Sequence, residues 1–380
     1  MTIQKMKTIF QGAALGAGVL LAGGCAGLQH YTLPATHEKS YEFSGYTVYP
    51  PQAEHWRLRY ENQELNMVSF INSEDYSILT VWVVPYFKNQ SPENTSKGTV
   101  EYFQNKILKE YRLSPDVRLS DQDIKHSEET IADKAYQVLT LTYDIEKEPY
   151  ELVIYYQVAL DNQLMLNASY LINKKKINKD KQPQFLAEVK DSIARIEARK
   201  ADPQKVIFLR VYYSYFDFID SAKDKYLKEK QEEIRGKFET ARQEIEEWAR
   251  LKTPNDRALN LLGLLATYNE KFEEYGEGFD AGKAESDFKQ AIAASSYNMD
   301  AAVNLAKLYK QTGRIDEAVK EYQAALIISP MSDEVYHELG KIEEARGDKV
   351  KAKEYYKKAV RYWQSGGQTL DELKKKIEKL

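Results

Sequence analysis

The chain has almost no cysteine, because Cys25 is the only one in 380 residues. A single thiol excludes an internal disulfide framework and every zinc site that needs several thiolate ligands. Histidine is also scarce: the five copies are scattered, and no pair has the i, i+4 spacing that puts two ligands on one helix face. We therefore expect no metal site and no cofactor.

The chain also lacks a strong excess of one charge. The formal net charge is −4, and loss of residues 1–24 would remove Lys5 and Lys7 but no acid, leaving −6. A general nucleic-acid binder would show a basic excess, so this balance argues against that class. Neither a Walker A phosphate loop nor the Gly-x-Ser-x-Gly turn of many hydrolases occurs. We therefore predict that the protein is not an enzyme and assign no catalytic residue.

A sequence repeat with a period of 34 residues lies within residues 300–363. Small, aromatic and turn residues recur at fixed offsets, namely Leu305, Ala306, Tyr309, Gly313, Ala318, Tyr322, Ala325 and Pro330, followed by Leu339, Gly340, Gly347, Ala352, Tyr356 and Ala359. This period is typical of a helix–turn–helix unit that stacks on copies of itself. The alanines are expected at close helix crossings, and the glycines in the turn between the two helices.

An earlier copy of the repeat carries an insertion. Its second helix has Ala284, Phe288 and Ala291 in register, whereas its first helix, with Gly263, lies about nine residues too early. Residues 267–283 therefore form an enlarged turn, which is acidic and contains three glycines. We expect a solvated loop there, not a phosphate loop or a calcium loop.

The three copies, over residues 257–365, resemble the tetratricopeptide repeat family. This resemblance implies an all-α solenoid whose first helices line a groove for a protein or peptide partner. The residues expected to contact the partner are Val303, Asn304, Lys307, Lys310, His337, Glu338, Lys341 and Glu344. Asn304 matches an asparagine often found in peptide-binding repeats, and the mixed charge implies a ligand of mixed charge. Reversing the charge of Lys307 and Lys341 is expected to weaken partner capture and leave the fold unchanged.

The first 25 residues form a second motif. Lys5 and Lys7 precede a short apolar run over residues 9–21, and small residues lead directly to Cys25. The run is too short for a comfortable membrane span. The stretch resembles a bacterial lipoprotein signal, over residues 1–24, which implies a lipid on Cys25. Ala26 stands where an aspartate favours retention in the inner membrane, which implies the outer membrane. An ordinary cleaved signal peptide is the alternative.

Residues 25–40 are expected to be a tether, and residues 41–200 an α+β domain. Strand-like runs cover residues 41–48, 56–60, 66–70, 76–86, 134–145, 150–160 and 164–172, and helical runs cover 99–111 and 185–196. The run at 76–86 is apolar on both faces, which predicts a central strand covered on both sides. The last three strands predict an antiparallel meander. The element order resembles the PsbP-like domain, an antiparallel sheet sandwiched with helices.

Residues 201–256 are expected to be a helical connector. The helical run at 205–251 starts with two apolar stripes, which favours a helix buried between two bodies over an aromatic ligand cradle. Pro254 ends the run. These helices could also be a degenerate first repeat. Residues 366–380, with the lysine cluster 374–376, are expected to form a polar capping helix with a solvated face.

These features predict an α+β chain, with a sandwich followed by an all-α solenoid, that acts as a membrane-anchored adaptor in the bacterial envelope. Its expected partners are the membrane, through Cys25, and a protein or peptide in the groove. Three alternatives remain: a part of an envelope-assembly or secretion apparatus, a sandwich that binds a small molecule in a deep pocket, and a hydrolase with an unrecognised site.

Overall fold

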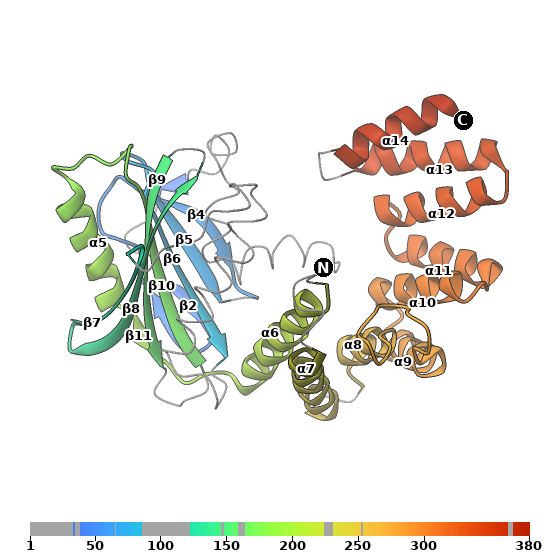
Figure 1. Cartoon of the computed structure of the whole chain (residues 1–380), viewed down its shortest axis with the longest axis horizontal. Coiled ribbons are helices and arrows are strands. Elements are labelled where there is room, and N and C mark those ends of the chain that lie inside the picture. The colour runs from blue at the N-terminus through green and yellow to red at the C-terminus, as the bar shows by residue number, and fades with distance from the viewer. Residues whose placement is uncertain are drawn as a thin grey trace. The chain divides into compact units, whose positions relative to one another are not determined.

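The structure of the chain is a computed structural model. It describes residues 33–34, 39–64, 66–85, 122–145, 148–158, 164–223, 231–251, 254–363 and 368–380. Two compact units are present, Met1–Tyr213 and Ser214–Leu380. The first is built around a β-sheet and the second from helices (Figure 1). Cys25, the apolar run before it and the helix expected at 99–111 lie outside the described residues.

An eight-stranded antiparallel sheet forms the first unit. Its strand order is β1 (Leu33–Pro34), β4 (Trp56–Asn62), β5 (Met67–Asn72), β6 (Ile78–Pro85), β10 (Leu164–Asn173), β9 (Glu148–Val158), β8 (Lys134–Ile145) and β7 (Ile124–Ile131). A second, three-stranded sheet has the order β11 (Glu197–Ala198), β3 (Tyr46–Val48) and β2 (Tyr41–Phe43). The α+β class with an antiparallel sheet is as the sequence predicts.

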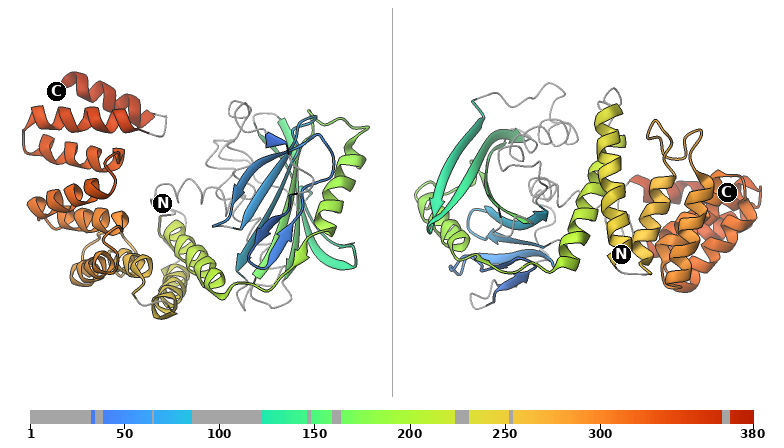
Figure 2. Two further views of the ribbon diagram at one scale, coloured as in Figure 1. Left: turned by 180° about the vertical axis from the view of Figure 1, so that it is seen from behind. Right: turned by 90° about the horizontal axis from the view of Figure 1, so that it is seen from below.

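The centre of the large sheet is buried on both faces. β6 lies between β5 and β10, and of its eight residues only Val84 is not fully buried. The predicted meander is present, because β8, β9 and β10 pair in sequence and antiparallel. On one face, α5 (Gln182–Ala194) packs Val189 and Ile193 into a core with residues of β5, β6 and β10. Figure 2 shows α5 beside this face from two further directions.

The edge strand β7 was not predicted. Its central residues, from Lys125 to Glu128, are exposed, so the strand has no alternation of apolar and polar residues. Its evidence is instead the turn that follows, where Ala132 and Asp133 both have positive φ and join β7 to β8. A polar edge strand of this kind is recognised only through its partner strand.

The second unit contains pairs of antiparallel helices. Its helices are α7 (Gln231–Leu251), α8 (Asp256–Ala266), α9 (Ala281–Ala294), α10 (Met299–Gln311), α11 (Ile315–Ile328), α12 (Asp333–Ala345), α13 (Lys349–Tyr362) and α14 (Gln368–Lys379). α6 (Pro203–Lys223) precedes them, and the boundary between the two units falls inside it. The predicted helix over 205–251 is therefore two helices. We call α8, α10 and α12 the A helices, and α9, α11 and α13 the B helices.

Side-chain caps set the starts of the A helices. Asn255, Asn298 and Ser332 each accept a hydrogen bond from a backbone N–H three residues further on. These bonds satisfy amides that have no partner within the helix. In the turns between A and B helices, Gly313 and Gly347 have φ of +78° and +81°, which favour glycine. The predicted turn glycines are thus confirmed.

The crossings of the repeats contain alanine, as predicted. Ala318 and Ala325 are completely buried, and so are the equivalent alanines of the other B helices, Ala284, Ala291, Ala352 and Ala359. The aromatic residue between each pair, Phe288, Tyr322 or Tyr356, is also 0% exposed. Small residues therefore let the helices approach, and one large ring fills the space between them.

The enlarged turn between α8 and α9 is folded around Asn269. The side chain of Asn269 accepts hydrogen bonds from the amides of Lys271 and Glu273 and donates one to the carbonyl of Glu277. Phe272, at φ of +57°, is only 5% exposed and lies 6.1 Å from Phe218 in ring distance. The expectation of a merely solvated acidic loop was therefore wrong, because an aromatic anchor holds the turn.

Candidate protein-binding surface on the A helices

Polar side chains connect each A helix to the next. Asn304 of α10 donates to Asn260 of α8 over 2.9 Å. Lys307 of α10 donates to Glu334, the second residue of α12, over 2.7 Å, and Lys310 donates to Glu338 over 2.6 Å. These bonds bring the predicted residues of α10 and α12 together on one side of the stack. The A helices therefore share a polar surface, which we call the A-helix surface.

Two of the predicted contact residues do not lie open on this surface. Val303 and Asn304 are 5% and 4% exposed, respectively. Asn304 spends its amide on Asn260, which is itself 5% exposed. Buried amides need such a partner, so Asn304 holds two repeats together. The expectation that Asn304 is dispensable for the repeat was wrong.

Glu338 is the centre of the charged network. It lies between Lys310 and Lys341 and accepts a hydrogen bond from each, at 2.6 and 2.7 Å. Burial alone would raise the pKa of Glu338, but the hydrogen bonds from Lys310 and Lys341 outweigh it, so its pKa lies below the ordinary value. The carboxylate is therefore charged at neutral pH and neutralises two cations of the surface.

These pairings correct the design of the double charge reversal. Lys307→Glu would face Glu334, and Lys341→Glu would face Glu338. Like charges at such distances repel, so this double variant is expected to lose stability as well as any binding. Neutral substitutions separate the two effects better.

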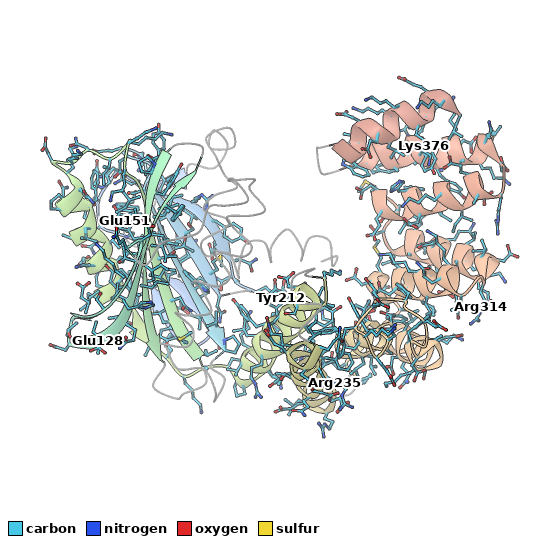
Figure 3. The ribbon with its side chains drawn as sticks, in the orientation of Figure 1. Glu128, Glu151, Tyr212, Arg235, Arg314 and Lys376 are labelled. Atoms are coloured by element: carbon cyan, nitrogen blue, oxygen red, sulfur yellow. The ribbon has the colours of Figure 1, made fainter. Side chains whose placement is uncertain are left out.

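The end of the surface is formed by α12 and α14. Glu344 accepts hydrogen bonds from Lys376 of α14 and from the Tyr356 hydroxyl, both at 2.6 Å. The bond from Lys376 and then that from Tyr356 lower the pKa of Glu344. Lys376, labelled in Figure 3, is therefore paired and does not belong to a free solvated face. His337 is half-buried, 5.9 Å from the Tyr356 ring, and burial lowers its pKa.

A second network joins repeats beneath the B helices. Glu285 of α9 accepts hydrogen bonds from Arg314, Tyr309 and Lys289, at 2.6, 3.0 and 2.6 Å. Arg314 also binds Glu317, and its guanidinium lies 4.1 Å from the Tyr309 ring centre. Arg314 is labelled in Figure 3. These bonds, led by that from Arg314, hold the pKa of Glu285 at about 2. The network fixes α9 against the next repeat.

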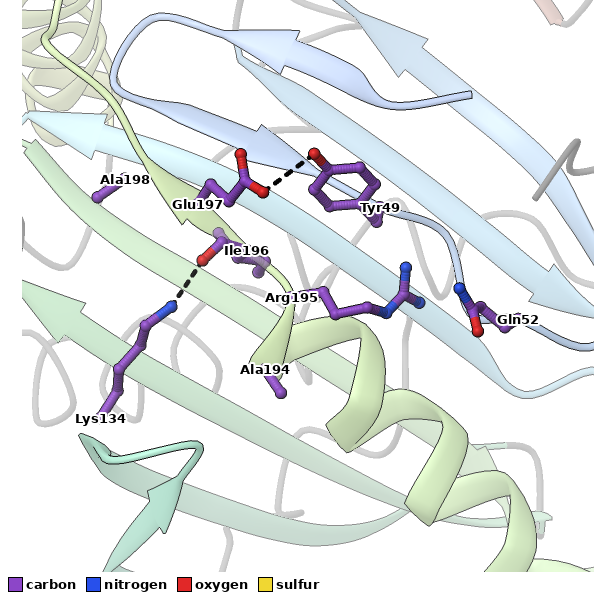
Figure 4. A pocket seen from close by; sticks show the side chains of 8 residues that line it. All are labelled: Tyr49, Gln52, Lys134, Ala194, Arg195, Ile196, Glu197 and Ala198. Atoms are coloured by element: carbon purple, nitrogen blue, oxygen red, sulfur yellow. Dashed lines mark hydrogen bonds between the residues drawn. The ribbon is translucent and has the colours of Figure 1, made fainter. Parts of the chain in front are cut away.

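A pocket of about 670 Å³ in the sheet unit bears on the small-molecule alternative. Lys134, Arg195, Tyr49 and Glu197 line it (Figure 4). Lys134 donates to the carbonyl of Ile196 and Arg195 to that of Pro50, both over 2.7 Å. Tyr49 donates to Glu197. Its polar groups therefore serve to hold β3, α5 and β11 together.

Two further features concern only the described part of the chain. There, no cluster of three or more histidine, cysteine, aspartate or glutamate side chains has the geometry to hold a metal ion. Within the same residues, no helix has the length and apolar character needed to cross a membrane.

Comparison with protein families identifies the repeats. Residues 277–342 and residues 333–362 match family models described as tetratricopeptide repeat. The helical region that these matches cover, 277–362, is therefore an array of tetratricopeptide repeats, and the sequence-based assignment is confirmed. Such repeats present a continuous surface to a protein or peptide, so the array is a protein–protein interaction module. No curated protein matches the chain.

Several solved structures are similar to part of the chain. MamA is 22% identical with a TM-score of 0.29, and the match covers 46% of this chain and 91% of that one. The Arabidopsis OM64 TPR domain is 18% identical with a TM-score of 0.28, covering 33% and 94%. The Yersinia enterocolitica type III secretion translocator chaperone SycD is 16% identical with a TM-score of 0.29, covering 35% and 96%. Each match spans less than half of this chain.

Proposed function

We propose that this protein is a membrane-anchored adaptor without catalytic activity. A lipid on Cys25 attaches it to the bacterial outer membrane, where it faces the periplasm, and the A-helix surface binds a protein partner. The interaction function rests on the tetratricopeptide repeats of residues 277–362. The anchoring rests on the apolar run and the small residues that precede the only cysteine.

The observation that carries the adaptor function is the arrangement around Glu338. Lys310 and Lys341 flank this carboxylate on one surface, and Lys307 and Glu334 lie on the same pair of helices. All these charges are partly exposed, with Lys341 at 42% of its side chain. Ion pairs at an edge of this kind exchange partners at little cost. A peptide with acidic and basic residues can therefore replace the internal pairs and bind with alternating charge contacts.

Partner capture tests the adaptor function. We expect Lys341→Ala to reduce the amount of partner recovered by cross-linking from native membranes, because it removes one exposed cation and leaves Glu338 paired with Lys310. Lys320→Ala is the matched control, since Lys320 is an exposed lysine on the B helix α11. Equal capture by both variants would contradict the assignment of binding to the A-helix surface.

The anchor is tested separately. Cys25→Ser is expected to move the protein from the membrane fraction to the soluble fraction, because several acyl chains are needed for stable attachment. Intact-mass measurement of the wild-type protein should show the acyl groups. An unmodified mass with Cys25 present would contradict the anchoring and leave the adaptor function standing.

A further inference from the structure

The last B helix carries an unusual charge pattern. α13 has six basic residues and one acidic residue, a net charge of +5. Along it, Lys349, Lys353, Lys357 and Arg361 recur every four residues. Side chains with this spacing lie on one stripe of a helix. Lys357 and Arg361 are exposed, and Val350, on the same side of the helix, is 72% exposed.

The fold does not require this stripe. The equivalent positions of α11, 34 residues earlier, hold Ile315, Val319, Gln323 and Ile327, without any charge. Those of α9 hold Ala281, Glu285, Lys289 and Ala293, in which the two charges attract and form an ion pair of 2.6 Å. All three helices nevertheless bury the same alanine–aromatic–alanine set. The same element is thus built with neutral, paired or purely basic residues.

The stripe opposes the stability of its own helix. Like charges four residues apart repel one another, and here three such pairs follow in sequence. Lys349 also stands in the first turn of α13, where the helix dipole disfavours a cation and where no acidic residue compensates. Among the described residues, none of the four stripe side chains has an ion-pair partner, whereas Lys307, Lys310 and Lys341 on the A-helix surface are all paired.

We propose that the basic stripe of α13 is a docking surface for an anionic phospholipid membrane. Its four residues extend over about 18 Å along one helix, which suits a flat array of phosphate groups. Clusters of lysine and arginine bind such surfaces additively. Exposed Val350 adds an apolar side chain that the headgroup region accepts. An anionic surface relieves the repulsion along the stripe, and no phosphate needs to enter a pocket.

The aromatic residues beside the stripe favour lipid over nucleic acid. Tyr336 stacks with Tyr355 and with Tyr362, at ring distances of 6.3 and 5.8 Å, and Lys358 lies over the Tyr336 ring. The rings therefore use their faces on one another and on a cation. Single-stranded nucleic acids need free ring faces for base stacking.

This inference rests on the proposed function, because a lipid on Cys25 would hold the chain near a membrane. Tethering raises the effective concentration of a second, weaker contact. Docking of α13 would then fix the direction in which the A-helix surface faces its partner. The contact requires no acylation, so it can be measured on protein that has no anchor.

The test uses the full chain with Cys25→Ser and sedimentation with vesicles. We expect binding to vesicles that contain phosphatidylglycerol, none to phosphatidylcholine vesicles, and a decrease with salt. The variant Lys353→Gln, Lys357→Gln, Arg361→Gln should bind about 100-fold more weakly, as three lost cations predict. Its melting temperature should equal or exceed that of the wild type, since the repulsion is removed.

A matched control carries the same change of charge elsewhere. Lys125→Gln, Lys179→Gln, Lys200→Gln alters three exposed lysines of the sheet unit and should bind vesicles like the unaltered chain. Equal binding by the α13 variant, or absence of binding by the unaltered chain, would overturn the inference. So would tighter binding to an oligonucleotide or to a second copy of the chain at the same salt. Acylation of Cys25 and partner capture through Lys341 stay measurable in each case.

Discussion

A Cβ atom at Gly340 would lie 2.5 Å from the ring of Tyr356, so glycine in α12 makes room for the aromatic residue of α13. The same relationship joins Gly263 of α8 to Phe288 of α9, at 2.6 Å. Ala306 and Tyr322, at the equivalent positions of the middle repeat, are both completely buried. The contact between a small A-helix residue and a large B-helix ring therefore recurs in all three repeats.

This contact predicts the effect of size at position 340. Gly340→Leu should destabilise the protein by about 1–3 kcal/mol, because the completely buried Tyr356 has no space to move. Gly340→Ala should stay within about 1 kcal/mol of the wild type, since alanine favours the helix by about that amount and the middle repeat already accepts it. Urea denaturation measures both. A stable leucine variant would mean that the helices separate more easily than the packing implies.

Ala325 tests the crossing on the other side of the B helix. Ala325→Leu should destabilise by about 1–3 kcal/mol, because the position is completely buried. Gln323→Leu adds a side chain of the same size at an exposed position of α11 and should change the free energy of unfolding by less than about 0.5 kcal/mol. Equal melting temperatures for the two variants would show that the repeat register is wrong.

The bond between Asn260 and Asn304 predicts coupling between two repeats. Asn304→Ala leaves the buried amide of Asn260 without its partner, which should cost about 1–3 kcal/mol. Asn260→Ala should cost a similar amount. The double variant should cost less than the sum by at least about 0.5 kcal/mol. Additive effects in a double-mutant cycle would mean that the bond contributes nothing to stability.

Glu285 predicts a dependence of stability on pH. Hydrogen bonds, first that from Arg314, lower its pKa from 4.5 to about 2 in the folded protein. The stabilisation is therefore complete above about pH 4.5 and is lost as the pH falls towards 2. Glu285→Gln removes this titration, so its melting temperature should fall less than that of the wild type over this range. Glu354→Gln, at an exposed position of α13, should follow the wild-type profile.

The repeats were predictable from the sequence because their packing needs specific sizes at fixed spacing. Alanine at 318 and 325, and an aromatic ring between them, leave a period of 34 that no other constraint hides. The central strand β6 was predictable for a similar reason, since both of its faces are apolar. Its position between β5 and β10, which are distant in sequence, was not, because strand order is set by long-range pairing.

The candidate site was predictable only in part. The register placed Lys307, Lys310, Glu338 and Lys341 on one surface, and the structure joins them by ion pairs. The burial of Asn304 was missed, because a polar residue at a groove position gives no sign that its partner comes from an inserted repeat. Gln-free spacing of 43 residues between Gly263 and Ala306 hides that partner from the 34-residue register.

The most direct test of the adaptor function is photo-crosslinking in native membranes. A photoreactive residue at Lys307 or Lys341 lies on the A-helix surface, and one at Lys320 lies on a B helix. We predict the same cross-linked protein from positions 307 and 341, at one apparent mass, and none from position 320. Cross-links from position 320 alone, or from none of the three in membranes where the protein is abundant, would contradict a protein partner on the A-helix surface.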